Sequence, residues 1–283
     1  MRVVVTGGSG RAGRSVVPDL RAHGHDVLSV DRVPPPAGGG PAQIVDLLDL
    51  GQTVQCLADA DAVVHLAAIP APGFLPEGIT FTTNMTTTYN VFEAARLLGI
   101  GRVVWASSET VFGMPFERPP AYAPFDGDSE LRPESSYALS KVLSEELARQ
   151  FARRAGIASV GIRFSNILYE DEYPTLLPPI QADPLVRRVN LWNYVDVRDA
   201  ARSVRLALEA DTDGAEIVSI AAPDTLMDRP SAELMAEHFP DTELRELRGE
   251  YGSLISSRDA ERLIGYAPEH SWRDAPYSGA NGA

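Results

Sequence analysis

Cysteine is almost absent from this 283-residue chain, in which Cys56 is the only one. A single thiol cannot form an internal disulfide, and it excludes a metal cluster built from several cysteine ligands. The five histidines show no spacing typical of a metal site, so we expect no bound metal. Cys56 falls in a short predicted helix, where we expect a buried and unreactive thiol.

Clusters of basic residues and long apolar runs are also missing. Lys and Arg total 25 against 39 Asp and Glu, which gives a net charge of −14. This balance argues against nucleic acids and anionic membranes as partners. The longest apolar runs stay far below the roughly 20 residues of a membrane span. The first residues read as a strand instead of a signal peptide, so the cytoplasm is the expected compartment.

Glycine, by contrast, is concentrated directly after the first β-branched run, Val3–Thr6. A helix over residues 10–22 is predicted to follow the glycines. A strand, a glycine turn and a helix in this order are the context of a dinucleotide-binding fingerprint. Gly7 permits the tight turn, Gly10 lets a pyrophosphate approach the backbone, and Gly13 allows close packing of helix on sheet. The helix N-terminus then faces the phosphates.

The end of the second predicted strand, residues 26–31, bears on the choice of cofactor. Asp31 lies 18 residues beyond Gly13, where an acid commonly binds the ribose hydroxyls of the adenosine. A carboxylate there repels a 2′-phosphate and favours NAD over NADP. Arg32 could instead bind a 2′-phosphate, so NADP stays an alternative. Asp46 either reaches the adenine amine or is a plain turn or N-cap aspartate.

Strands and helices alternate along the rest of the chain, with an apolar strand at 62–68 that suits a sheet covered on both faces. We predict an α/β fold, a Rossmann-type doubly wound parallel sheet with a small C-terminal substrate-binding subdomain. Further strands are expected at 43–45, 101–108, 158–163 and 216–220, and helices at 50–57, 80–98, 135–148, 197–210, 231–238 and 258–263. Residues 34–41 are expected as a surface loop, 115–132 as a loop that covers the site, and 164–190 with little regular structure.

This organisation predicts a dinucleotide-binding core and a smaller second unit. The core takes residues 1–165, and 191–221 return to it. The substrate-binding subdomain takes 166–190 and 222–274, and residues 275–283 form a frayed tail.

Tyr137 and Lys141 carry the strongest chemical signal. They are four residues apart in a predicted helix, so their side chains share one face. A cation about 4 Å away, at an effective dielectric of about 20, favours the phenolate by roughly 4 kcal/mol. That lowers a phenol pKa from about 10 to near 7, so that Tyr137 can exchange a proton with a hydroxyl. Taken alone, the pair also fits a helix that merely contains Tyr and Lys.

Ser108 ends the predicted strand 101–108, at the edge of a parallel sheet where ligands bind. It could hold a substrate oxygen beside Tyr137, or simply cap backbone groups. Asn84, near the start of the helix at 80–98, could bridge to backbone or to groups of the cofactor loop.

Together these motifs resemble the extended short-chain dehydrogenase/reductases, the epimerase/dehydratase group that acts largely on nucleotide sugars. The resemblance runs from Met1 to about Ala210. It is carried by Thr6–Gly13, Asp31, His65–Ala68, Asn84, Asn90 with Glu93–Ala95, Ser107–Ser108 before Val111–Gly113, Tyr137 with Lys141, Arg163 with Asn166, and Tyr194–Asp199.

The resemblance implies an NAD-dependent enzyme in which Tyr137 is the acid/base, Lys141 tunes it and holds the nicotinamide ribose, and Ser108 orients the reacting oxygen. The cofactor-binding residues expected on this basis are Gly7, Gly10, Arg11, Ala12, Gly13, Asp31, Arg32, Asp46, Leu47, Leu66, Ala67, Ala68, Asn84, Ser107, Tyr137, Lys141 and Asn166. The substrate residues expected are Ser108, Glu109, Thr110, Asn166, Arg187 and Trp192.

Departures from the family pattern leave several reactions open. Glu109-Thr110 replaces the Asp-Glu of dehydratases, which disfavours dehydration, and the C-terminal part is short for a nucleotide-sugar cap. The first hypothesis is an epimerase of the UDP-glucose 4-epimerase type with retained NAD. The alternative is a net NAD(P)-dependent dehydrogenase or reductase of a smaller sugar or uronate, and a non-catalytic NAD(P)-sensing regulator is the remote one. A homodimer through the helices at Thr80 and Tyr137 would follow the family habit.

Overall fold

The computed structural model describes residues 1–35, 38–116 and 118–274. The predicted tail at 275–283 lies outside the described residues, as do 36–37 of the predicted surface loop and 117 of the predicted covering loop. A seven-stranded sheet has the order β10-β7-β5-β4-β1-β2-β3, and its pairings from β3 through β5 are parallel. Its strands are β1 (Arg2–Thr6), β2 (Asp26–Asp31), β3 (Ala42–Ile44), β4 (Ala62–His65), β5 (Arg102–Ser108), β7 (Ala158–Phe164) and β10 (Ala215–Ile220). The predicted Rossmann-type α/β fold is confirmed.

The direction of strand addition reverses between β1 and β4. The chain first adds β2 and β3 on one side of β1 and then adds β4 and β5 on the other. At this switch Thr6 is in register with His65 on one side and with Val30 on the other. Ligands of open parallel sheets bind outside the carboxyl ends of the strands at such a switch point. The glycine turn begins there.

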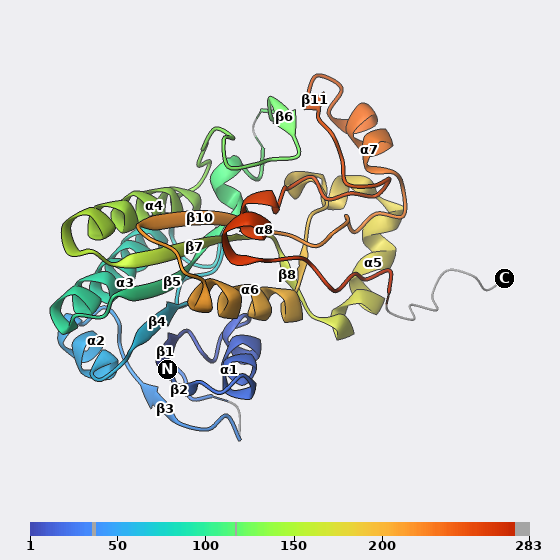
Figure 1. The fold of residues 1–283 in the computed structure, drawn as a ribbon. Coiled ribbons are helices and arrows are strands. Elements are labelled where there is room, and N and C mark those ends of the chain that lie inside the picture. The colour runs from blue at the N-terminus through green and yellow to red at the C-terminus, as the bar shows by residue number, and fades with distance from the viewer. Residues whose placement is uncertain (36–37, 117, 275–283) are drawn as a thin grey trace. The chain divides into compact units, whose positions relative to one another are not determined.

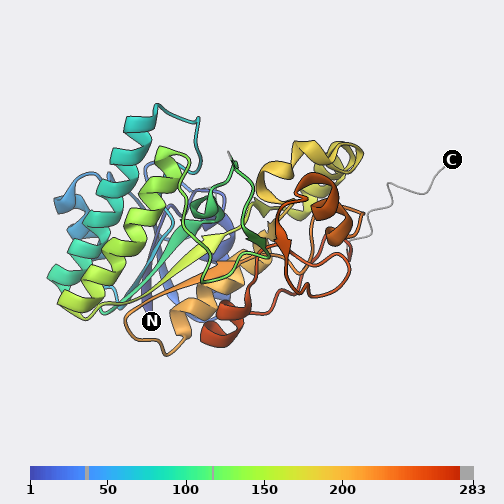
Figure 2. The same cartoon turned by 90° about the horizontal axis from the view of Figure 1, so that it is seen from above.

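Helices cover both faces of the sheet (Figures 1 and 2). On one face α2 (Leu50–Leu57), α3 (Glu77–Leu98) and α4 (Ser136–Ala155) pack over a fully buried core that includes Phe92, Trp105 and Phe151. On the other face α1 (Gly13–Ala22) lies beside α6 (Val197–Glu209), and Asp19 accepts a 3.1 Å bond from Arg205. Within the described residues, no helix is both long and apolar enough to cross a membrane.

The chain divides into two compact units. The first holds Met1–Ser108, Ser135–Arg163 and Ala201–Val218, and the second holds Glu109–Glu134, Phe164–Ala200 and the described residues from Ser219 onward. The second unit thus includes 109–134 and 191–200, which the sequence analysis assigned to the core. Short strand pairings join these segments to it: β6 (Tyr122–Ala123) pairs with β11 (Glu243–Leu244), and β8 (Ile167–Leu168) with β9 (Val195–Asp196).

The second unit contains a helix that the sequence analysis missed. Residues 164–190 were predicted to have little regular structure, but Tyr173–Ala182 forms α5, with prolines at 174, 178 and 179. Short 3₁₀ turns flank the helix, and α7 (Ser231–His238) and α8 (Arg258–Ile264) lie near their predicted positions. The bounds of most other elements shift by up to three residues: α1 begins at Gly13, β4 ends at His65, and α3 begins at Glu77. The helix α4 continues beyond its predicted end at 148 to Ala155.

Candidate active site

The glycine turn after β1 is held so tightly that two positions accept only glycine. Gly7 has a φ of +71°, and a Cβ there would lie 2.6 Å from the backbone nitrogen of Ala67. A Cβ on Gly13 would lie 2.2 Å from the carbonyl oxygen of Gly7. Gly7 therefore makes the turn against the β4 loop, and Gly13 brings α1 onto it. These are the roles that the spacing predicted for both glycines.

The N-terminus of α1 opens onto this turn in a form that fits an anionic group. In the described part of the chain, the N-cap residue Ala12 makes no side-chain capping bond, and the first turn of the helix has no acidic residue. The positive end of a helix in this form attracts a diphosphate. The turn and the helix end therefore fit the phosphates of a dinucleotide, with Gly10, Arg11 and Ala12 as the proposed contacts.

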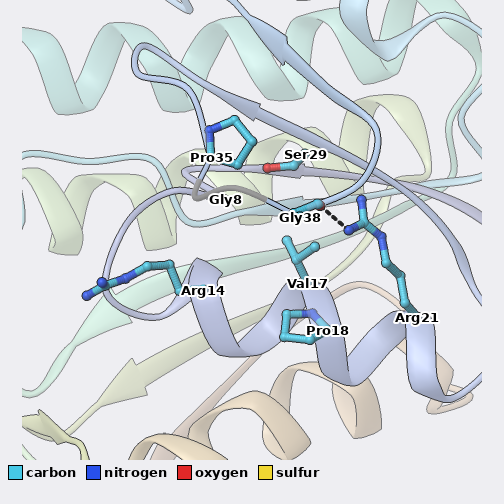
Figure 3. A pocket seen from close by; sticks show the side chains of 9 residues that line it. Gly8, Arg14, Val17, Pro18, Arg21, Ser29, Pro35 and Gly38 are labelled. Atoms are coloured by element: carbon cyan, nitrogen blue, oxygen red, sulfur yellow. Dashed lines mark hydrogen bonds between the residues drawn. The ribbon is translucent and has the colours of Figure 1, made fainter.

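A cavity of about 390 Å³ lies beside the same turn, between α1 and the loop after β2 (Figure 3). Arg21 of α1 reaches across to this loop, where its guanidinium donates to the carbonyls of Gly39 and Pro41 (3.2 Å). It also donates to the carbonyl of Val27 in β2 (2.8 Å). Arg21 thereby ties the loop to the helix. The sequence analysis did not identify this role, because the partners are backbone carbonyls of another segment. The cavity is lined by Gly8, Arg14, Val17, Pro18, Arg21, Ser29, Pro35, Gly38 and Gly39.

Asp31 bonds to the glycine turn. Its Oδ2 accepts from the backbone N–H of Ser9 at 2.9 Å, and its Oδ1 accepts from that of Arg32 at 2.6 Å. The carboxylate at the end of β2 therefore stands at the predicted place, with lone pairs left for further donors. Arg32 is exposed beside it. Both residues stay predicted cofactor contacts.

Asp46 makes the bond expected of the plainer of its two predicted roles, and its contact with the adenine amine stays a prediction. Its Oδ1 accepts from the Leu48 N–H at 3.0 Å, which makes it a turn aspartate, while Asp49 caps α2. The neighbouring Leu47 is fixed by Asn90, whose side-chain amide donates to its carbonyl at 2.8 Å. Asn90, one of the family-motif residues, thus shapes this turn from α3.

Asn84 acts on the loop that follows β4. Its buried amide accepts from the Ile69 N–H at 2.8 Å and donates to the Ile69 carbonyl at 3.2 Å. It therefore fixes the segment after Leu66, Ala67 and Ala68, which are half-buried at the carboxyl end of β4. The bridge to backbone was one of the two roles expected for Asn84, and the structure shows it. The bridge lies next to three residues that are predicted to bind the cofactor.

The end of β5 carries two serines with different surroundings. Ser107 donates to Glu145 Oε1 at 2.8 Å, so its hydroxyl is used inside the fold. Glu145 is fully buried and also pairs with Arg163 through two bonds of 2.8 and 2.7 Å. Ser108 follows Ser107 with 7 % of its surface exposed. The sequence analysis missed Glu145, although its position one turn beyond Lys141 was a usable signal.

Tyr137 and Lys141 lie on one face of α4, as predicted. Ser135 caps this helix by accepting from the Ala138 N–H at 3.1 Å. The Lys141 Nζ lies 5.6 Å from the centroid of the Tyr137 ring and donates to the Ala106 carbonyl at 2.8 Å. The bond to Ala106 places the cation at the carboxyl end of β5, one residue before the two serines. Tyr137, Lys141 and Ser108 all belong to the first unit.

Burial changes the proton affinity of two groups at this end of the sheet. Desolvation lowers the pKa of Lys141 to about 8. His65 is buried as well, and desolvation with a smaller contribution from the Lys141 charge lowers its pKa to about 3. Its Nδ1 lies 2.8 Å from Thr6 Oγ1 and its Nε2 lies 3.2 Å from Thr88 Oγ1. His65 is therefore a neutral bridge between β1, β4 and α3.

The remaining predicted substrate residues lie in the second unit. Glu109 and Asn190 are buried and bonded at 3.0 Å, with Arg187 facing the same carboxyl. Thr110 stands in the 3₁₀ turn Glu109–Phe112, and the Asn166 carbonyl accepts from the Val195 N–H. Trp192 does not reach a surface: it is 0 % exposed, and its indole N–H donates to the Pro184 carbonyl at 2.7 Å. It packs in the core of this unit and is not proposed as a substrate contact.

A Rossmann sheet with this glycine turn and with Tyr and Lys on one helix defines an enzyme of the short-chain dehydrogenase/reductase class, of the extended type. Residues 3–221 match the NAD dependent epimerase/dehydratase family, and the chain belongs to that family. The resemblance stated from the motifs is confirmed.

Known proteins similar to this chain include sugar enzymes of two kinds. L-arabinose 1-dehydrogenase (NAD(P)(+)) of Haloferax volcanii is 31% identical over 220 residues, which are 74% of this chain and 83% of that protein. UDP-glucose 4-epimerase of Corynebacterium glutamicum is 25% identical over 310 residues, with 96% and 92% covered. Among solved structures, MoeE5 in complex with UDP-glucose and NAD has a TM-score of 0.74 at 26% identity, with 97% and 95% covered.

Proposed function

We propose that this enzyme oxidises a sugar hydroxyl by hydride transfer to bound NAD. The observation that carries the proposal is the placement of Tyr137 and Lys141 on one face of α4, with the Lys141 Nζ bonded at the carboxyl end of β5. The glycine turn and the uncapped end of α1 support the cofactor part of the proposal. The relatives support the substrate class, because the arabinose dehydrogenase and the UDP-glucose epimerase both act on sugars.

In this proposal the protein moves the proton and positions the groups. The nicotinamide, when bound, supplies the hydride acceptor. The Tyr137 phenolate takes the hydroxyl proton, and the protonated Lys141 stabilises that phenolate through its charge. Ser108 orients the reacting oxygen. Lys141 has to stay charged for this role, and its pKa of about 8 keeps most of it protonated at neutral pH.

For the complete reaction, each of two candidates has its own support. Epimerisation of a nucleotide sugar, with re-reduction by retained NADH, is favoured by the near-full-length match to UDP-glucose 4-epimerase. Net oxidation of a smaller free sugar is favoured by the higher identity to L-arabinose 1-dehydrogenase. NAD that remains bound after purification, without net NADH on addition of sugar, would select the first. NADH in excess over enzyme would select the second.

The cofactor and the assembly complete the proposal. We infer NAD as the preferred cofactor, because the Asp31 carboxylate at the end of β2 repels a 2′-phosphate. NADP use through Arg32 is the alternative. We also infer a homodimer through α3 and α4.

The acid/base role of Tyr137 can be tested by removing its hydroxyl. Tyr137→Phe should abolish turnover, with a loss of at least about 10²-fold typical of a removed general acid/base, because phenylalanine cannot carry the proton. NAD affinity, measured by fluorescence titration, should stay within about twofold, since the glycine turn is unchanged. Tyr122→Phe, a change in the second unit, is the matched control and should keep turnover. Wild-type-like turnover of Tyr137→Phe would remove Tyr137 from the mechanism.

A further inference from the structure

Arg21 bonds α1 to the loop that joins β2 to β3. Its guanidinium donates to the carbonyls of Gly39 and Pro41, the latter at 3.2 Å, and to that of Val27 in β2 at 2.8 Å. Hydrogen bonds from a charged donor are stronger than those between neutral groups. One side chain of α1 therefore fixes both β2 and the end of the loop that leads into β3.

The loop is shaped to receive this guanidinium. Gly40 has a φ of +69°, and a Cβ there would lie 2.6 Å from Arg21 Nη1. A larger residue at position 40 would therefore be strained and would push against the guanidinium. Glycine lets the backbone approach Arg21 closely, so that the carbonyls on either side of it, those of Gly39 and Pro41, both reach the guanidinium.

A cavity takes the place of side-chain packing between the loop and the helix. It has a volume of about 390 Å³ and is lined by Val17 and Pro18 of α1 and by Pro35 and Gly39 of the loop (Figure 3). Groups that face each other across such a space lose their van der Waals contacts. The polar bonds of Arg21 therefore hold the loop against α1 at this place.

The other end of the loop begins at the carboxylate on which the choice of cofactor is proposed to depend. Asp31 Oδ1 accepts from the Arg32 N–H at 2.6 Å, and Oδ2 accepts from the Ser9 N–H at 2.9 Å. The Ser9 hydroxyl also donates to the Val33 carbonyl at 3.0 Å. The first residues of the loop thus orient the Asp31 carboxylate, and the exposed Arg32 follows it directly.

We propose that Arg21 is a specificity-determining residue for the cofactor: by holding the loop after β2 against α1, it keeps Asp31 and Arg32 in the arrangement that selects NAD over NADP. The inference rests on the proposed function and deepens its cofactor part. Arg21 is a positioning residue, because it acts through the loop. Without its bonds, the segment that starts at Arg32 is free to move, the Asp31 carboxylate loses a fixed donor, and the Arg32 guanidinium can turn toward a 2′-phosphate.

Replacement of Arg21 by methionine tests this inference, because methionine keeps an unbranched apolar stem and removes every donor. The dissociation constants of NAD and NADP are measured by fluorescence titration on the wild type and on Arg21→Met. The ratio of the NADP constant to the NAD constant should fall about fivefold or more, a factor typical of one lost hydrogen bond. Arg21→Lys keeps the charge but not the fork of donors, and should give an intermediate ratio.

Arg205→Met is the matched control for this variant. Arg205 also bonds to α1, at 3.1 Å from Asp19, but it ties the helix to α6 instead of to the loop. The control should keep the wild-type ratio, which separates a general loosening of α1 from an effect on the loop. An unchanged ratio in Arg21→Met, with urea unfolding showing that the variant is folded, would overturn the inference and leave the proposed function standing. Wild-type protein that binds neither dinucleotide would refute the proposed function together with the inference.

A second variant disturbs the same bonds from the side of the loop. Gly40→Ala keeps Arg21 but puts a methyl group against its Nη1, so the ratio should fall as in Arg21→Met. Gly24→Ala is the control for backbone strain, because Gly24 has a similar φ of +84° and, beyond its chain neighbours, no described atom lies within 4 Å of a Cβ there. It should keep the wild-type ratio. Equal ratios in the two alanine variants would overturn the inference, because the contact with Arg21 would then make no difference.

Discussion

Lys141 is the only lysine of the chain, and the other 24 basic residues of the Lys and Arg count are arginines. The distinction matters, because a guanidinium keeps its charge at every accessible pH, whereas a buried ammonium can lose its proton. Lys141 is 5 % exposed and donates to the Ala106 carbonyl. Desolvation therefore acts on the one cation whose charge the proposed chemistry uses.

Because the chain has a single lysine, its NMR resonance needs no assignment. In protein labelled with [¹³Cε]lysine, the single resonance should titrate near pH 8, well below the ordinary 10.5, because burial disfavours the charged form. The enzyme should correspondingly lose kcat/KM above about pH 8, as the phenolate loses its neighbouring cation. The same chain unfolded in urea supplies the control, and its resonance should titrate near 10.5. A folded-state midpoint above pH 10 would contradict this account of Lys141.

His65 gives the fold a separate pH dependence. Its folded-state pKa of about 3 lies below the ordinary 6.5, so the unfolded chain binds a proton at a higher pH than the folded chain does. The stability contributed by neutral His65 is fully present above pH 6.5 and is lost as the pH falls toward 3. At pH 5 the loss amounts to about 2 kcal/mol, from 1.36 kcal/mol per pH unit.

Urea unfolding at pH 7 and pH 5 measures this contribution. Wild-type protein should lose about 2 kcal/mol more between the two pH values than His65→Gln does, because glutamine can bond to Thr6 and Thr88 without titrating. The difference between the two proteins isolates His65 from the acidic groups that also titrate in this range. Equal losses in both proteins would mean that His65 does not remain neutral in the fold.

At the scale of elements, α4 is fastened to two strands by one carboxylate. Glu145 accepts from Ser107 of β5 and from Arg163 of β7, and all three side chains are buried. Glu145 lies one turn after Lys141 on α4. Its bonds fix the position of the helix along β5 and β7, and in this position Lys141 reaches the Ala106 carbonyl. The position of the proposed acid/base thus depends on a bridge that contacts neither substrate nor cofactor.

Breaking this bridge should cost stability. Glu145→Gln leaves Arg163 with an unpaired buried charge, and the loss of one partner of such a pair typically costs about 3–5 kcal/mol. Urea denaturation should show it as a lower midpoint. Glu146→Gln, an exposed position next in the same helix, is the matched control and should stay within about 0.5 kcal/mol of wild type. A small effect at Glu145 would show that the helix is fixed by its apolar contacts alone.

How much of the structure could be predicted from the sequence depends on how far apart along the chain the interacting residues lie. The strand–glycine–helix start and the Tyr137–Lys141 helix depend on neighbours within a few residues, so local patterns sufficed. The helix α5 was missed because its three prolines read as loop. Pro174 lies in the first turn, where a proline costs a helix little, but Pro178 and Pro179 lie inside the helix, where local propensity opposes the structure that forms. Trp192 was predicted as a substrate residue, because the neighbouring sequence does not show that tertiary packing buries its side chain. Glu145 was missed because its partners lie 38 and 18 residues away.

At the scale of the whole molecule, exposed apolar side chains stand out on the two helices that carry the proposed dimer surface. Ile79 and Tyr89 of α3 are 50 % and 44 % exposed, and Leu139 and Leu143 of α4 are 39 % and 40 % exposed. The two helices pack against each other, with the Tyr89 ring meeting Phe151 edge-on at 6.1 Å. These four exposed side chains therefore belong to one packed pair of helices, and we propose them as the dimer surface. The charge of −14 per chain opposes self-association at low salt.

Wild-type protein at micromolar concentration should show twice the chain mass of 30.6 kDa in light scattering, because burial of the four apolar side chains offsets the charge repulsion. Leu143→Glu places a charge in the contact and should give monomers, whereas Leu185→Glu, an exposed leucine of the second unit, should leave the mass unchanged. The dimer fraction at limiting concentration should rise between 20 mM and 200 mM salt, since salt screens the repulsion between two acidic chains but leaves apolar burial intact. A monomeric wild type at both salt concentrations, or a Leu143→Glu variant that stays dimeric, would rule out α3 and α4 as the interface.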